Sequence, residues 1–253
     1  MLKTVNRSYR TLLYSTGFGR FMGLSSSSKN MSTYIVEPSG QHTASLIFLH
    51  GLGDTGEGWS QLFRMKKKPH VRYVFPTAPI APVTLNGGMP MPSWFDIYGL
   101  APDSPEDEQG VKQSAQKLAQ LISDEEKRGI PRSRIVIGGF SQGGAVALYT
   151  AFTSGGSKLG GLLALSTWMP SHKTLPELIN QSENKALKIL QCHGQVDPVV
   201  QFFIGVRTSE ILKANCPNFT FKQYENLAHS SCDEVCIYFF LSLNALTRLL
   251  ILL

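Results

Sequence analysis

Cysteine is scarce in this 253-residue sequence: only four are present, and none occurs before Cys192. Cys192 and Cys216 lie far apart, and no apolar signal-peptide core precedes them. The sequence therefore indicates a reduced, intracellular protein without a disulfide framework, and we expect a cytoplasmic location. Cys232 and Cys236 have the spacing of two ligands on one helical face, but no second pair of Cys or His completes a metal-binding set, so we expect no metal site.

Acidic residues are absent from the first 36 residues. Residues 1–30 hold five of the 24 lysines and arginines and none of the 18 acids, so the rest of the chain has 19 basic and 18 acidic side chains. The formal charge of +6 therefore does not indicate a nucleic-acid-binding surface. Two interpretations of residues 1–30 stay open: a mitochondrial transit peptide, because the segment is rich in Ser, Thr, Arg and Tyr, or a disordered extension ahead of a functional start at Met31.

Internal repeats and linkers are also absent from the body of the chain. Its length, with 42% hydrophobic and 17% charged residues, suits one large α/β domain, which we place at residues 31–234. Short, continuous apolar runs alternate with helix-like segments, as expected of strands buried on both faces of a mostly parallel sheet with helices on both sides. The predicted strands are residues 45–49, 71–75, 134–138, 161–166, 187–192 and 219–224.

Residues 76–105 are rich in Pro and Gly and show no convincing period. A loop of this length inside a compact domain is uncommon and is often an active-site lid or wall. Met89, Met91, Trp94 and Phe95 within it are candidate substrate-binding residues that could line an apolar groove. They could equally be ordinary anchors of the loop in the core.

One serine, Ser141, lies among four glycines in the stretch GGFSQGG, between the apolar run RIVI and the helix-like segment AVALYTAF. This is a G-x-S-x-G motif at a strand-to-helix turn. In such a nucleophile elbow the serine backbone is strained and its neighbours must be small, so that strand and helix can approach. We therefore predict Ser141 as a catalytic nucleophile.

A serine hydroxyl becomes a good nucleophile only when a base takes its proton and an acid orients that base. In α/β-hydrolases the order along the chain is serine, acid, histidine. Asp197 follows a buried strand in HGQVDPVV, and His229 follows FTFKQY, so we predict these two as the acid and the base. Glu225 is the alternative acid, and His193 is interpreted as structural.

The oxyanion of an acyl-transfer reaction needs two backbone N–H donors. One is expected from Gln142, directly after the nucleophile. The other is expected from the loop after the strand SLIFL, where we choose Leu52, with Gly53 as the alternative. His50 in this loop is interpreted as a structural side chain.

Seven motifs occur in an order that resembles the acyl-protein thioesterase and lysophospholipase family, the type 2 carboxylesterases. The resemblance covers about residues 31 to 234 and is carried by FLHGLGDTG, MPSWFDI, DEQGV, GFSQGGAVALY, ILQCHG, DPVV and HSSC. It implies an α/β-hydrolase fold and the triad Ser141, Asp197 and His229, with Leu52 and Gln142 as oxyanion donors.

The same resemblance implies what the protein acts on. The expected substrates are S-acylated, notably palmitoylated, proteins, with further activity on lysophospholipids and small esters. It also implies that the stretch from Met89 to Phe95 borders the acyl channel. Acyl transfer through a serine needs no cofactor, so we expect none. Transient association with a membrane surface stays open. The oligomeric state stays open.

Residues 235–253 depart from the family pattern, which continues as an amphipathic helix with charged positions. Here the 19 residues carry a single charge, Arg248, and little helical periodicity. Three interpretations stay open: a variant segment that still packs on the sheet, a hydrophobic membrane anchor, or a segment that compromises the fold.

Overall fold

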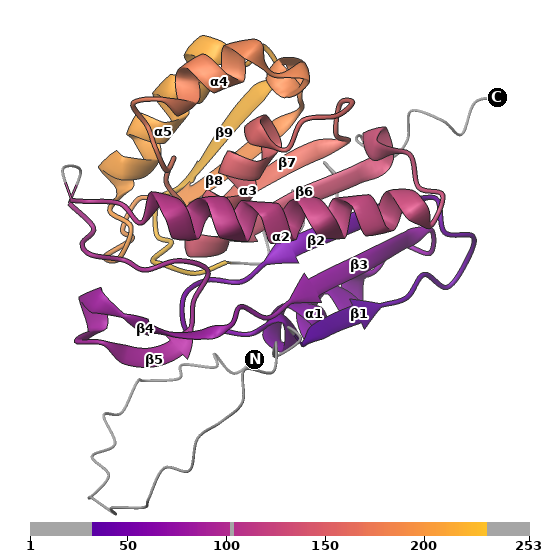
Figure 1. Ribbon diagram of the computed structural model, residues 1–253, viewed down its shortest axis with the longest axis horizontal. Coiled ribbons are helices and arrows are strands. Elements are labelled where there is room, and N and C mark those ends of the chain that lie inside the picture. Colours follow the sequence, from indigo (N-terminus) through magenta and orange to yellow (C-terminus); the bar gives the residue numbers. More distant parts are fainter. Residues whose placement is uncertain (1–31, 102–103, 232–253) are drawn as a thin grey trace, which may run out of the picture. The chain divides into compact units, whose positions relative to one another are not determined.

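A seven-stranded sheet forms the centre of the domain that the structure describes (Figure 1). The computed structural model describes residues 32–101 and 104–231. The strands, in their spatial order, are β1 (Thr33–Val36), β3 (Val71–Pro76), β2 (Ala44–Leu49), β6 (Ile135–Phe140), β7 (Gly161–Leu165), β8 (Ile189–Gly194) and β9 (Phe219–Tyr224). Only β1 pairs antiparallel; the other neighbours in this sheet are parallel. The predicted mostly parallel α/β sheet is confirmed, and all six predicted strands lie within two residues of their expected bounds.

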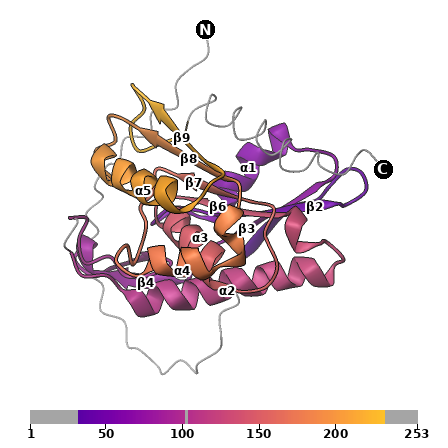
Figure 2. The same cartoon turned by 90° about the horizontal axis from the view of Figure 1, so that it is seen from above.

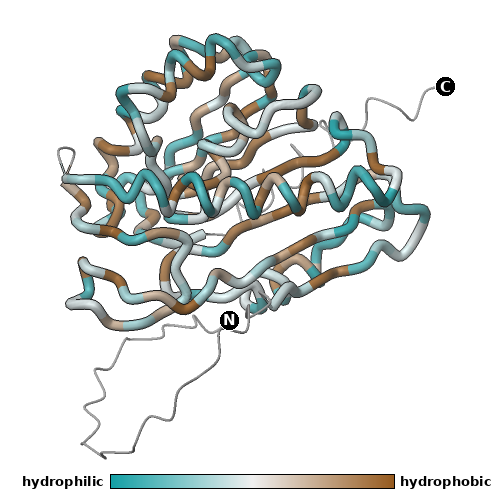
Figure 3. The backbone as a smooth tube through the Cα atoms, viewed as in Figure 1, coloured by the Kyte–Doolittle hydropathy of each residue, from teal (hydrophilic) through white to brown (hydrophobic). Residues whose placement is uncertain are grey.

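The central strands form from continuous apolar runs in the sequence. Every residue of β2 is buried, and Leu46, Ile47 and Phe48 are fully so, as expected of a strand covered on both faces. The hydrophobic colouring in Figure 3 follows these central strands. The sequence analysis did not anticipate β1, a short strand at the edge of the sheet with only Val36 buried.

Helices cover both faces of the sheet, as expected. They are α1 (Gly56–Lys66), α2 (Glu108–Lys127), α3 (Gln142–Thr153), α4 (Leu175–Gln181) and α5 (Phe202–Asn215). Trp59 and Phe63 of α1 join the core cluster on one face, whereas α2 to α5 all contribute to the cluster on the other. Figure 2 shows α1 and α2 on opposite sides of the sheet.

Residues 76–105 are more regular than expected, and the prediction of an irregular stretch was wrong in part. Strand β4 (Ile80–Val83) pairs antiparallel with β5 (Met89–Pro92), and a 3₁₀ turn, Thr84–Asn86, lies between them. Prolines at positions 82, 90 and 92 hid the strand pattern. A two-stranded ribbon tolerates them because each of its strands has an open edge that needs no N–H donor.

Strand β6 and helix α3 approach so closely that glycine is required at their junction. A Cβ atom added at Gly139 would lie 2.3 Å from the carbonyl carbon of Gly143, and one at Gly143 would lie 2.5 Å from the carbonyl oxygens of both Leu49 and His50. These obstacles are backbone atoms, which cannot move as a side chain can. The glycines of the GGFSQGG stretch thus serve close packing at this turn.

We expect Gly143→Ala to lower the free energy of unfolding by about 1–3 kcal/mol or more, because the added methyl group overpacks a backbone junction. Urea unfolding measures this. The matched control is Gly58→Ala in the exposed part of α1, where the nearest atom, an oxygen of the Asp54 side chain, would be 3.5 Å away. That change should be neutral or stabilising by up to about 1 kcal/mol. Equal losses in the two variants would contradict the packing argument.

Candidate active site

The turn between β6 and α3 holds Ser141 in a strained conformation. Its φ and ψ are 52° and −121°, in a region that residues other than glycine rarely adopt. The backbone N–H of Ser141 donates to the carbonyl of Leu165 at 2.8 Å, and its carbonyl accepts from the Thr167 hydroxyl at 2.7 Å. The sequence analysis did not anticipate Thr167. The end of β7 therefore stabilises the turn from the side.

Ser141, His229 and Asp197 form one chain of hydrogen bonds. Nε2 of His229 lies 3.0 Å from the Ser141 hydroxyl, and Nδ1 lies 2.7 Å from Oδ2 of Asp197. A carboxylate only accepts hydrogen bonds, so Nδ1 carries the proton and Nε2 is free to accept one from serine. The three residues follow β6, β9 and β8, which are parallel, so the connections after their carboxyl ends meet at one edge of the sheet.

The Asp197 carboxylate is held from two sides. Oδ1 accepts the backbone N–H groups of Val199 and Val200 at 2.9 and 3.0 Å, which leaves Oδ2 to His229. The side chain of Asp197 is fully buried, whereas that of His229 is 16% exposed. Glu225, the alternative acid, is exposed, and Asp197 is the carboxylate that contacts the histidine.

His193 lies beneath this acid-bearing turn and is fully buried. Its Nε2 lies 2.8 Å from the carbonyl oxygen of Val200 and 3.6 Å from Oδ2 of Asp197. Burial lowers the pKa of His193, although the carbonyl of Val200 and the charge of Asp197 oppose this effect. A neutral His193 that donates to Val200 agrees with its interpretation as a structural residue.

Neither predicted oxyanion donor, the N–H of Gln142 or that of Leu52, has a hydrogen-bond acceptor in the part of the chain that the structure describes. The N–H of Gln142 is at the amino end of α3, where no carbonyl of the helix can accept it. Within the described residues, no hydrogen bond engages the N–H of Leu52, whereas that of Gly53 donates to the carbonyl of Pro92 at 2.9 Å. The geometry therefore favours Leu52 over the alternative Gly53. The loop also touches the nucleophile, because a Cβ atom added at Gly51 would lie 3.3 Å from that of Ser141.

The four candidate substrate-binding residues occupy different environments. Met89 is 61% exposed on the β4–β5 hairpin, and Met91 packs partly buried against the core. Trp94 is buried, and its indole N–H donates to the carbonyl of His50 at 2.8 Å. Of the four, only Phe95 lines the pocket described next.

The side chain of Gln142 fastens this segment to the nucleophile elbow. Its Oε1 accepts the N–H of Trp94 at 3.0 Å, while Nε2 donates to the carbonyl of Phe95 at 2.7 Å and to the hydroxyl of Ser93 at 3.0 Å. Gln142 is fully buried, so these bonds satisfy an amide that has no access to water. Residues 93–95 thus mainly support the turn at Ser141 and the loop that follows β2.

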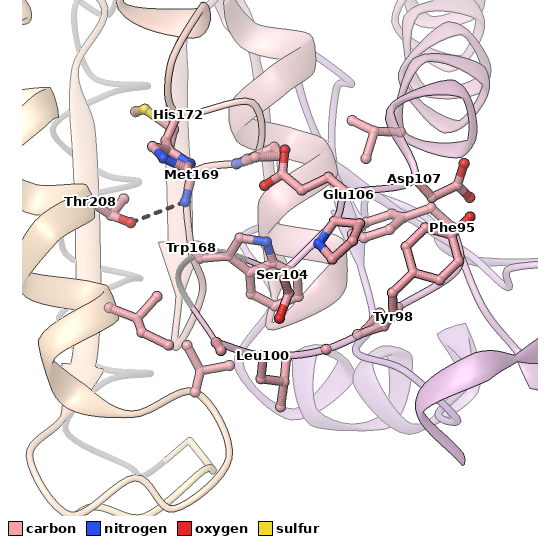
Figure 4. Close-up of a pocket in the computed structure, with 18 of the residues that line it drawn as sticks. Phe95, Tyr98, Leu100, Ser104, Glu106, Asp107, Trp168, Met169, His172 and Thr208 are labelled. Atoms are coloured by element: carbon pink, nitrogen blue, oxygen red, sulfur yellow. Dashed lines mark hydrogen bonds between the residues drawn. The ribbon is translucent and has the colours of Figure 1, made fainter. Parts of the chain in front are cut away.

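An apolar pocket lies between three chain segments (Figure 4), and none of the three triad residues is part of its lining. The first segment, between β5 and α2, contributes Phe95, Ile97 and Leu100. The connection after β7 contributes Trp168 and Met169, and the start of α5 with the residues before it contributes Val200 and Ile204. Glu106, His172 and Arg207 add polar groups to its lining. Two walls of the pocket are connected to the triad. Trp168 directly follows Thr167, whose hydroxyl donates to the Ser141 carbonyl, and the backbone N–H of Val200 donates to Asp197.

The described residues thus bring together the groups that acyl transfer requires: a hydroxyl bonded to a histidine of defined tautomer, two N–H groups without an acceptor, and an apolar pocket. Fold and site together define the class as an α/β-hydrolase of the serine type.

Comparisons with known proteins agree. The model of the phospholipase/carboxylesterase family matches residues 30–243, so the chain belongs to that family and is a hydrolase. Acyl-protein thioesterase 1 of Mycosarcoma maydis is 44% identical over 223 residues, which cover 81% of this chain and 92% of that protein. The acyl-protein thioesterase 1 of Cryptococcus neoformans is 40% identical over 79% of this chain and 90% of its own length.

Solved structures show the same likeness. Acyl-protein thioesterase 2 of Zea mays superimposes with a TM-score of 0.78 at 35% identity and covers 86% of this chain and 100% of its own. SOBER1 of Arabidopsis thaliana gives 0.75 at 30% identity, covering 81% of this chain and 99% of its own.

Several expectations concern parts of the chain outside the described residues. They concern the extension at residues 1–30, the tail at residues 235–253, and Cys232 and Cys236. The expected domain boundaries at residues 31 and 234 lie there too. Within the described ranges, no helix is both long enough and apolar enough to cross a membrane.

The buried histidines predict how stability depends on pH. Burial lowers the pKa of both His50 and His193 below the ordinary value of 6.5. Below pH 6.5 the unfolded chain therefore binds more protons than the folded one, so the stability present above this pH is progressively lost as pH falls.

We expect His193→Gln to reduce this dependence, because glutamine does not titrate. Urea unfolding of both proteins between about pH 7 and 5.5 measures the slope, which should differ by up to one proton. An identical slope in the variant would show that His193 titrates alike in the folded and unfolded states.

Proposed function

We propose that the protein hydrolyses thioesters that link long acyl chains to protein cysteines, through an acyl-serine intermediate on Ser141. The observation that carries this proposal is the chain of hydrogen bonds from Asp197 through His229 to Ser141, adjoined by an apolar pocket. The names of the relatives, acyl-protein thioesterases at 40–44% identity, support the same substrate class. Acylated proteins are then the partners.

In the first step, Oγ of Ser141 attacks the acyl carbonyl carbon while Nε2 of His229 takes the hydroxyl proton. The oxyanion that forms is stabilised by the N–H groups of Leu52 and Gln142. As the tetrahedral intermediate collapses, the carbon–sulfur bond breaks, and His229 returns the proton to the departing thiolate. Asp197 stays ionised throughout and stabilises the imidazolium.

In the second step, water replaces the thiol. His229 takes a proton from the water, which attacks the acyl-serine ester, and the fatty acid leaves as the serine hydroxyl is restored. The pocket would hold the acyl chain through both steps, because its lining is mainly apolar and includes Trp168 and Phe95. This requires no electron transfer and no cofactor.

A second candidate is hydrolysis of lysophospholipids or small carboxylic esters, which the family's description favours. Both activities use the same chemistry and differ in the leaving group. Turnover of a palmitoylated peptide compared with that of a palmitoyl lysophospholipid, on full-length protein, separates them. Greater kcat/KM on the lysophospholipid would reverse the order of the two proposals.

We expect Ser141→Ala to lower thioesterase kcat by more than about 10⁴-fold without loss of fold, because the nucleophile is removed. Labelling by a fluorophosphonate probe should be lost with it. The control is Ser133→Ala, an exposed serine just ahead of β6, which should leave both unchanged. A folded wild-type protein that the probe does not label would identify the chain as a catalytically silent acyl-binding protein instead.

A second variant tests the pocket. Ile204→Asn places an amide in the apolar lining and should raise KM for a palmitoyl substrate about 10-fold, because burial of an isoleucine is worth about 1.5–3 kcal/mol. Turnover of an acetyl ester should change little, since a two-carbon chain has little apolar surface to bury.

Val206→Asn, on the same helix but outside the pocket lining, is the matched control. Equal effects of the two substitutions on long and short substrates would rule out this pocket as the acyl-chain site.

A further inference from the structure

His50 is a fully buried histidine that the triad does not use, yet both of its ring nitrogens have partners. Nε2 lies 2.9 Å from the backbone nitrogen of Ala78, and Nδ1 lies 2.7 Å from the carbonyl oxygen of Gly51. A backbone N–H can only donate, so Nε2 must accept. The proton therefore resides on Nδ1, which donates to Gly51.

The ring itself is held in place. Its centroid lies 5.1 Å from that of the Trp94 ring, and the indole N–H of Trp94 donates to the carbonyl of His50. Burial lowers the pKa of His50, which agrees with a neutral imidazole. A rigid donor of defined direction thus points from the end of β2 into the loop that follows.

The carbonyl of Gly51, which accepts this hydrogen bond, and the N–H of Leu52 belong to the same peptide group. A trans peptide is planar, and its C=O and N–H point in opposite directions. No peptide bond among the described residues is cis. When His50 holds the Gly51 oxygen on one side, the Leu52 N–H must therefore point to the other, away from the histidine.

Neighbouring bonds restrict the same peptide further. The N–H of Asp54 also donates to the Gly51 oxygen, at 3.2 Å, and the next peptide is held by the bond from Gly53 to Pro92. Gly51 also lies near the elbow, since a β-carbon added there would be 3.3 Å from that of Ser141. The unbonded Leu52 N–H thus belongs to a peptide that is fixed next to the nucleophile.

We propose that His50 is a positioning residue that orients the Leu52 N–H as an oxyanion donor, by holding the Gly51 carbonyl with its Nδ1–H. This inference rests on the proposed hydrolase function and adds to it the origin of the donor's direction. His50 touches no reacting atom. It acts through one peptide plane, so its loss should weaken transition-state binding and leave substrate binding largely intact.

Two substitutions separate the functions of the two nitrogens. His50→Asn places an amide N–H near the site of Nδ1 and can keep the bond to Gly51. His50→Gln places its amide near the site of Nε2 and can keep only the bond to Ala78. A merely structural histidine would be replaced about equally well or badly by either.

With an acetyl ester as substrate, we expect His50→Gln to lower kcat about 10- to 100-fold with little change in KM, whereas His50→Asn stays within about 3-fold of wild type. A trifluoromethyl ketone, which forms an oxyanion on serine, should lose affinity for His50→Gln in the same proportion. The thermal unfolding midpoints of both variants are measured alongside. Equal losses of kcat in the two variants, or a loss that follows stability alone, would overturn the inference.

The tautomer of His50 can be tested in the wild-type protein, without any substitution. In wild-type protein, ¹⁵N NMR of the histidine rings should show His50 with its proton on Nδ1 and a bare Nε2. A proton on Nε2 would overturn the inference. Failure of the proposed function is recognised separately, since wild type would then neither react with a fluorophosphonate nor turn over the ester.

Discussion

The contact between strand β6 and helix α3 is the constraint on which the site depends. Backbone atoms of the elbow, of Leu49 and of His50 lie so close together that no side chain fits at Gly139 or Gly143. This contact forces Ser141 into its strained conformation and brings the amino end of α3 against the carboxyl end of β2. The Ser141 hydroxyl, the N–H of Gln142 and the loop that holds Leu52 therefore meet at one place because of a single packing condition.

Buried polar side chains turn this contact into a defined geometry. Gln142 joins the elbow to residues 93–95, Trp94 joins that segment to His50, and His50 holds the peptide of Leu52. Each of these side chains satisfies its partners away from water, where an unmade hydrogen bond would be costly. The MPSWF segment thus contributes little surface to the pocket, of which only Phe95 is part, and much of the support of the catalytic loops.

How far the sequence predicts this site depends on the range of the interaction. The order of Ser141, Asp197 and His229 after three apolar runs was sufficient to propose the triad, because parallel strands end at one edge of a sheet. The choice of Asp197 over Glu225 could also be argued, since Glu225 lies only four residues before His229 on the same short connection. By contrast, the hydroxyl of Thr167 and the N–H groups that hold Asp197 have no pattern in sequence that marks them. The β4–β5 hairpin was missed for a different reason, because its prolines mask the alternation of a strand.

By itself, the sequence determined the six parallel strands of the sheet, the strained turn at Ser141, and which residues supply the hydroxyl, imidazole and carboxylate groups of the site. These follow from local rules: apolar runs form buried strands, and glycines permit close backbone approach. Only the tertiary structure favours Leu52 over Gly53, because it shows the N–H of Gly53 already bonded to the carbonyl of Pro92, a residue far along the chain. It likewise decided that the apolar pocket combines three distant segments and that His50 faces Gly51, because hydrogen bonds and cavities are set by which groups meet once the chain is folded.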